Sequence, residues 1–120
     1  MRSNVLVYLS GPITAAHGYT VEQNVADGVR ALTECIERGL PAFCPHVTAV
    51  VALPYETMMA YDFAVIDRCT HVLMLPRWET SNGAIREAKY ATLRSVPVFY
   101  SLDRLIAHVD GAAHVEPKTT

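Results

Sequence analysis

Short apolar runs alternate along the chain with longer segments in which apolar residues recur at helical spacing. The short runs predict β-strands over residues 4–9, 42–45, 71–76 and 97–101. In the longer segments, apolar side chains return every three or four positions, which predicts helices over residues 21–38, 56–69, 83–94 and 102–109. The first run is apolar on both faces, as is typical of a central strand in a parallel sheet.

Local signals at the ends of these segments agree with the periodicity. Thr20 and Gln23 form a T-x-x-Q capping box before the first helix, and Gly39 followed by Pro41 ends it. Strands that alternate with helices favour a parallel sheet with right-handed crossovers. We therefore predict a small doubly wound, Rossmann- or flavodoxin-like α/β domain of four to five strands with helices on both faces.

The length of 120 residues fits one domain, which we place at residues 1–109, followed by a loose polar tail over residues 110–120. Ligands of such sheets bind beyond the carboxyl ends of the strands. This rule brings three loop sequences to one rim: "SGPIT" (10–14), "CPHV" (44–47) and "PRWETSNG" (76–83). We expect the functional residues of the protein there.

Two acidic residues are predicted to point inward near this rim. Glu87 lies about 70° around its helix from the centre of a stripe of small residues, Ala84, Ala88, Ala91 and Ser95, and is therefore on the inward side. Asp62 lies between two apolar stripes of the preceding helix. A single inward carboxylate is more simply explained by a helix N-terminus or an arginine partner. Two such acids, one on each helix that flanks the third strand, indicate a functional site.

The rim also offers groups that could bind a ligand. Ser81, Asn82 and Gly83 stand at a helix N-terminus, which favours an anion such as phosphate, although S-N-G is also a common helix-start sequence. Gly11 would let the first loop approach a ligand closely, and Thr14 could donate a hydroxyl hydrogen bond.

The aromatic and histidine residues of the rim leave alternatives open. The phenol of Tyr8 could reach the site or be a packed core tyrosine, and Trp78 could stack on a planar base or cover the end of the sheet. His46 and His17 also lie at the rim, and either can be structural. Their spacing to carboxylates does not indicate a catalytic triad.

Composition excludes several classes of function. The net charge is -2 and the basic residues are scattered, so no nucleic-acid polymer is expected as a partner. The longest apolar runs are too short to cross a bilayer, and no export signal is evident at the N-terminus. The odd count of 3 cysteines then indicates reduced thiols and a cytoplasmic protein. Cys44 and His46 alone are too few ligands to predict a metal site.

The segments "VYLSGPIT", "FCPHV" and "YDFAVIDRCTHVLMLPRWETSNGAIREAKYATLRSVPVF" resemble the nucleoside 2-deoxyribosyltransferase-like superfamily over about residues 5–100. The match is closest to its small uncharacterised branch with Y-L-[SA]-G-P and L-P-x-W-x-x-S-x-G-A-x-x-E motifs. The resemblance implies that Glu87 is a nucleophile at the anomeric carbon, that Asp62 binds sugar hydroxyls or assists the leaving base, and that Tyr8 orients the nucleophile. It also implies a phosphate site formed by Gly11, Pro12, Ile13, Thr14, Ser81 and Gly83.

One departure from that superfamily concerns the phosphate. Its phosphate-binding members often carry an arginine in the first loop, and "GPITAAHG" has none. His17 or Arg86 could substitute, or the substrate could lack a phosphate.

The resemblance leads to a primary hypothesis and to alternatives. The primary hypothesis is hydrolysis of the N-glycosidic bond of a (deoxy)nucleoside 5′-monophosphate, without metal or organic cofactor. The alternatives are a deoxyribosyltransferase that exchanges bases, a nucleotide-binding module without turnover and, more remotely, a TIR-like NAD-cleaving enzyme. Ile85, Tyr90 and Leu93 form a second apolar face on the helix of Glu87, which predicts a homodimer or larger homo-oligomer.

Overall fold

The computed structural model describes residues 1–48 and 52–114, and within them the predicted α/β fold is confirmed. The strands of this part form one parallel sheet in the order β2-β1-β3-β4, and their bounds are β1 Val7–Ser10, β2 Ala42–Phe43, β3 His71–Met74 and β4 Val98–Phe99. The α-helices are α1 Val21–Glu37, α2 Tyr55–Ile66, α3 Asn82–Leu93 and α4 Leu102–His114. Two 3-10 turns, η1 Pro45–Thr48 and η2 Trp78–Thr80, follow β2 and β3.

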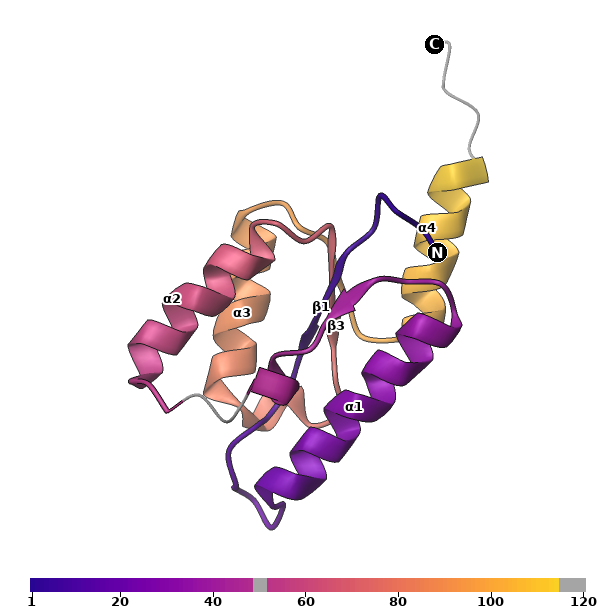
Figure 1. The fold of residues 1–120 in the computed structure, drawn as a ribbon. Helices are drawn as coiled ribbons and strands as arrows, with labels where there is room; N and C mark the ends of the chain where they lie inside the picture. Colours follow the sequence, from indigo (N-terminus) through magenta and orange to yellow (C-terminus); the bar gives the residue numbers. More distant parts are fainter. Residues whose placement is uncertain (49–51, 115–120) are drawn as a thin grey trace.

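The helices cover both faces of the sheet (Figure 1), with α1 and α4 on one side and α2 and α3 on the other. Side chains of a strand alternate between faces, and β1 divides its residues accordingly. Val7 and Leu9 join the core under α1 and α4, whereas Tyr8 joins the core under α2 and α3. Ser10 is also fully buried, so the central strand contributes two polar side chains to the α2/α3 layer.

The predicted capping signals are confirmed. The hydroxyl of Thr20 accepts from the backbone N–H of Gln23, whose side chain accepts from the Thr20 N–H in return. Gly39 has a φ of 76°, the left-handed conformation that glycine adopts most readily. The hydroxyl of Ser81 caps α3 by accepting from the N–H of Ala84 at 3.1 Å. Thr20 and Ser81 therefore fix where α1 and α3 begin, at the carboxyl edge of the sheet, and Gly39 fixes where α1 ends, before β2 starts.

The C-terminal helix is longer than the sequence predicted. α4 continues through His114, so residues 110–114, which were predicted to belong to a loose tail, are helical. The rest of the predicted tail, residues 115–120, lies outside the described residues. Val109 is buried against the sheet, and Asp110 forms a 2.7 Å ion pair with Arg2. The ion pair of Asp110 extends the tertiary contacts of α4 beyond Val109, the last residue of the predicted helix. In the described part of the chain, no helix is both long and apolar enough to span a membrane.

Candidate active site

Glu87 lies between α3 and the central strand with both carboxylate oxygens hydrogen-bonded. The phenol of Tyr8 donates to Oε2 at 2.8 Å, and the hydroxyl of Ser10 donates to Oε1 at 2.6 Å. Tyr8 and Ser10 are two residues apart on β1, and their side chains therefore point to the same face of the sheet. Glu87 is 5% exposed, which confirms its predicted inward position. The strand thus holds one carboxylate in a fixed orientation.

Asp62 brings a second carboxyl group to the same place. It projects inward from α2, is 8% exposed, and interacts electrostatically with both Glu87 and Tyr8. The inward orientation predicted from its helical position is confirmed. Three residues predicted to be catalytic therefore converge from β1, α2 and α3. Ser10 completes this cluster and was missed at the level of sequence, although its two-residue spacing from Tyr8 was a usable signal.

Burial dominates the protonation of this cluster. Burial is the main cause that raises the pKa of Glu87 to about 8. The hydrogen bonds from Ser10 and Tyr8 lower this pKa, and the neighbouring Asp62 raises it. Burial also raises the pKa of Asp62, against the lowering effect of hydrogen bonds with Glu87 and Tyr8. Burial and the adjacent carboxylates raise the pKa of Tyr8, so its phenol stays protonated as a donor. The two acids titrate as a pair, and we expect the pair to retain a proton near neutral pH.

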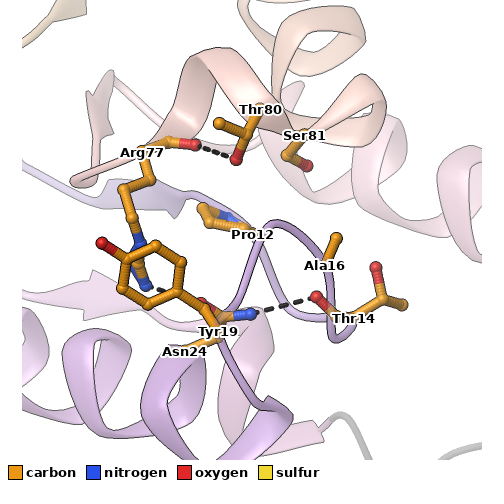
Figure 2. Close-up of a pocket in the computed structure, with 8 residues that line it drawn as sticks. All are labelled: Pro12, Thr14, Ala16, Tyr19, Asn24, Arg77, Thr80 and Ser81. Atoms are coloured by element: carbon orange, nitrogen blue, oxygen red, sulfur yellow. Dashed lines mark hydrogen bonds between the residues drawn. The ribbon is translucent and has the colours of Figure 1, made fainter.

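A small pocket lies between the first loop and the N-terminus of α3 (Figure 2). Its volume is about 20 Å³, room for about one water molecule, and it is lined by Pro12, Thr14, Ala16, Tyr19, Asn24, Arg77, Thr80 and Ser81. Three of these residues, Pro12, Thr14 and Ser81, were predicted to bind substrate. The chain links the pocket to the acids, because Pro12 follows Ser10 by two residues and Ser81 precedes Glu87 by six.

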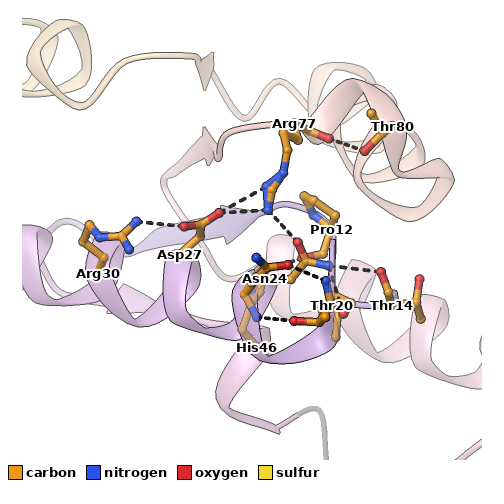
Figure 3. Close-up of polar contacts among 11 residues, drawn as sticks. Pro12, Thr14, Thr20, Asn24, Asp27, Arg30, His46, Arg77 and Thr80 are labelled. Carbon is orange, nitrogen blue, oxygen red and sulfur yellow. Dashed lines mark hydrogen bonds and ion pairs between the residues drawn. The ribbon is translucent and has the colours of Figure 1, made fainter. Parts of the chain in front are cut away.

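Arg77 is the cation of this pocket. Its Nη2 donates to Oδ1 of Asn24 at 2.6 Å and to Oδ2 of Asp27 at 2.9 Å, and Asp27 also binds Arg30 at 2.8 Å (Figure 3). The Nδ2 of Asn24 donates to the carbonyl of Thr14 at 3.0 Å, which ties the first loop to α1. Sequence reasoning did not single out Arg77 or Asn24. An arginine directly after the third strand, at the ligand-binding edge, was the available signal.

The other predicted binding residues differ in what they contact. At Gly11, a Cβ would lie 2.8 Å from the Cβ of Leu75, so close packing against the core requires a glycine here. The predicted contact of Gly11 with a ligand stays a prediction. At Gly83, a Cβ would meet other atoms only at ordinary distances of 3.6 Å or more. The carbonyl of Ile13 accepts from Asn24 at 3.3 Å. Asn82 is exposed as the first residue of α3.

His46 and Trp78 occupy structural positions. His46 is 2% exposed, its Nε2 lies 3.0 Å from the carbonyl of Pro12, and its ring packs against Gly28 of α1. Burial lowers the pKa of His46, which favours the neutral ring with Nε2–H as the donor. The ring of Trp78 lies 5.2 Å from that of Tyr100, beyond β4, and packs on the core at the end of the sheet. These contacts match the structural alternatives left open by the sequence.

Neither proposed substitute for a first-loop arginine lines the pocket. Arg86 forms a two-point ion pair with Glu56, at 2.9 and 3.0 Å, on the outer side of α2 and α3. His17 is exposed at the tip of the first loop, with a φ of 54°. Arg77, which comes from a different loop, is the arginine found among the pocket residues.

The apolar face of α3 that predicted a homo-oligomer is partly covered within the chain. Tyr90 stacks on Phe63 of α2 with ring centroids 4.3 Å apart, and its hydroxyl donates to Asp67 at 2.8 Å. Tyr90 is therefore not available to a second subunit in the way that the predicted apolar face requires, because α2 packs against it. Leu93 remains 84% exposed, and Ile85 is half-buried. Oligomerisation through this face stays a prediction that now rests on these two residues.

Residues that could bind a metal do not gather in the described ranges. Across residues 1–48 and 52–114, no group of three or more histidine, cysteine or acidic side chains has a metal-binding arrangement. The cysteines are free and buried, and burial raises the pKa of Cys35 and of Cys69 to about 11. These thiols therefore stay protonated at neutral pH, which makes them poor nucleophiles.

Comparison with known proteins identifies a family but no function. No curated protein and no solved structure shows significant similarity to the chain. The profile of the family described as Domain of unknown function (DUF4406) matches residues 5–100, a range that includes β1, α2 and α3 with all four residues of the acid cluster. Since this match covers well over half of its length, the chain belongs to the DUF4406 family.

Proposed function

We propose that the protein hydrolyses the N-glycosidic bond of a (deoxy)nucleoside 5′-monophosphate. The observation that carries the proposal is the buried carboxylate of Glu87, whose two oxygens are hydrogen-bonded by Tyr8 and Ser10 beside the second acid Asp62. Cleavage of such a bond passes through an oxocarbenium-like state. A carboxylate that is fixed in a poorly solvated place stabilises or captures that state strongly.

The reaction assigns a different role to each acid. An oxygen of Glu87 bonds to C1′ while the C1′–N bond breaks, and the electron pair of that bond passes to the base nitrogen. This step requires the form of the pair whose single proton is on Asp62, whereas the pKa of Glu87, about 8, favours the proton on Glu87 in the free protein. From that form Asp62, whose pKa is also raised by burial, donates the proton to the leaving base. Water then attacks C1′, displaces Glu87 as a carboxylate and returns a proton to Asp62. The products are the free base and the sugar 5-phosphate.

Tyr8 and Ser10 support the role of Glu87 in this scheme. Both donate to its oxygens and thereby favour the ionised, nucleophilic form against burial and the neighbouring acid. The resemblance to the nucleoside 2-deoxyribosyltransferase-like superfamily assigns the nucleophile, the second acid and the tyrosine to the same three residues. The pocket between the first loop and the N-terminus of α3 supplies hydroxyl groups and an arginine, which are donors suited to the phosphate of a nucleotide.

The test is product analysis by chromatography. The purified protein and a Glu87→Ala variant are incubated with the common nucleosides, deoxynucleosides and their 5′-monophosphates, with and without an added free base. We expect release of free base by the wild type and not by the variant. Product that forms only with the added base would replace hydrolysis by base exchange. Intact substrates at high protein concentration would refute both and favour a binding module.

A further inference from the structure

Arg77 carries a positive charge that its protein partners do not fully neutralise. Arg77 and Arg30 share the single carboxylate of Asp27, at 2.9 and 2.8 Å, so this cluster of three residues has a net positive charge (Figure 3). Arg30 points to solvent with its side chain 64% exposed, whereas the side chain of Arg77 is 18% exposed and lines the pocket. The excess charge is therefore placed beside the pocket, on the arginine that water shields least.

The guanidinium of Arg77 also has donor capacity to spare. Its terminal nitrogens bind Asn24 and Asp27, but its Nε–H is buried and has no hydrogen-bond partner among the described residues. A buried donor without a partner is costly, and it needs an explanation in a folded protein. An anionic ligand with several acceptor oxygens would satisfy it, because a guanidinium presents a planar set of donors that matches phosphate.

Tyr19 covers this guanidinium. Its ring centroid lies 3.7 Å from the Arg77 Cζ (Figure 2), and a pair of backbone hydrogen bonds with Ala16 at 3.0 and 3.1 Å closes the loop that carries it. In this arrangement the pocket holds about one water molecule, which is too little space for a phosphate group. A phosphate therefore fits beside Arg77 only if the pocket widens, and Tyr19 is the side chain stacked on the guanidinium.

We propose that Arg77 binds the phosphate of the substrate and selects nucleoside 5′-monophosphates over free nucleosides, with Tyr19 leaving the guanidinium as the phosphate enters. This inference rests on the proposed function for the rest of the substrate. The phosphate would lie between Arg77, the hydroxyl of Thr14 and the capped N-terminus of α3 at Ser81. The sugar would then extend toward Glu87, which follows Ser81 by six residues on the same helix.

The inference is tested by calorimetric binding, which does not depend on turnover. The probes are the four common deoxynucleosides, their 5′-monophosphates and inorganic phosphate, each added to the full chain. The variants are Arg77→Gln, Arg77→Lys and the matched control Arg30→Gln. Like Arg77→Gln, the control removes one arginine that pairs with Asp27, but this arginine lies outside the pocket. Circular dichroism establishes that each variant is folded, and Arg77→Lys keeps the charge if Arg77→Gln does not fold.

We expect Arg77→Gln to weaken binding of a 5′-monophosphate by about ten- to a hundredfold, because a charge-assisted hydrogen bond is lost. Binding of the free nucleosides should stay unchanged. Arg77→Lys should lose less than Arg77→Gln. Arg30→Gln also removes one charge from the cluster, but the side chain of Arg30 is 64% exposed and screened by solvent, so binding should stay within about threefold of the wild type. Equal losses in Arg77→Gln and Arg30→Gln, or equal losses for nucleosides and monophosphates, would overturn the role of Arg77. A wild type that shows no preference for monophosphates, or that binds no phosphate-bearing probe, would overturn it as well.

The two proposals fail separately in this design. Binding of inorganic phosphate through Arg77 without binding of any nucleoside or nucleotide would retain the anion site and refute the proposed substrate class. Release of base from nucleosides, with no effect of Arg77 on monophosphate binding, would retain the glycosidase and refute the role of Arg77.

Discussion

Replacing Glu87 by glutamine should change how the stability of the protein depends on pH. The pKa of Glu87 is raised from 4.5 to about 8 in the folded protein, chiefly by burial. Glu87 therefore holds its proton more tightly in the folded than in the unfolded chain. Its favourable contribution is fully present below pH 4.5 and is lost as the pH rises to about 8.

The magnitude follows from this shift. Between the two pKa values the free energy of unfolding should fall by ~1.4 kcal/mol for each pH unit. From pH 5 to pH 8.5 the wild type then loses up to about 4 kcal/mol that a glutamine at this position does not lose. The introduced glutamine would present an amide N–H₂ to one of the two donors, Tyr8 or Ser10, and this cost is the same at every pH. Only the slope with pH is therefore diagnostic.

The assay is urea unfolding of wild type and Glu87→Gln at several pH values from 5 to 8.5. Glu37→Gln, at an exposed glutamate at the end of α1, is the matched control and should follow the wild-type curve. Asp62 is present in all three proteins, but it titrates as a pair with Glu87, so its own pH dependence changes in Glu87→Gln and is followed by carboxyl NMR in both proteins. Parallel curves for wild type and Glu87→Gln would refute the reasoning, because Glu87 would then have the same proton affinity in the folded and unfolded chains.

Three further substitutions test separate parts of the structure. Ser10→Ala removes one donor to Glu87 and should raise its pKa by about one to two units, as followed by carboxyl NMR; an unchanged pKa would contradict the hydrogen bond. Gly28→Ala places a methyl group 2.6 Å from the His46 Cγ and should destabilise the protein by about 1–3 kcal/mol in urea, more than the helix gains from alanine. Thr20→Ala breaks the capping box and should cost about 1 kcal/mol by the same measurement; no loss would show that the cap is dispensable.

The sequence was sufficient where one element alone carried the signal. Strand and helix periods predicted the layered fold, and helical position predicted that Glu87 and Asp62 point inward. Ser10 follows the same logic, since it shares a strand face with Tyr8, but its position before a glycine and a proline suggested a loop.

The residues whose surroundings the sequence did not predict depend on partners from elsewhere in the chain. Leu75 requires a glycine at position 11, and the ring of His46 requires a glycine at position 28. No periodicity relates the two residues of either pair. Arg77 adopts a φ of 65°, which turns its side chain toward α1. A non-glycine residue in this conformation is uncommon, so neither spacing nor composition could have predicted where its guanidinium lies.

The central claim is that Glu87 attacks the anomeric carbon. Its most direct test is the rate of base release from the best 5′-monophosphate substrate, measured for wild type and Glu87→Gln, with the fold of both verified and binding of the substrate measured in parallel. We expect Glu87→Gln to bind the nucleotide and to release base at least about 10³-fold more slowly, the upper end of what one preorganised electrostatic group contributes. Base release at the wild-type rate by the folded variant would contradict the claim.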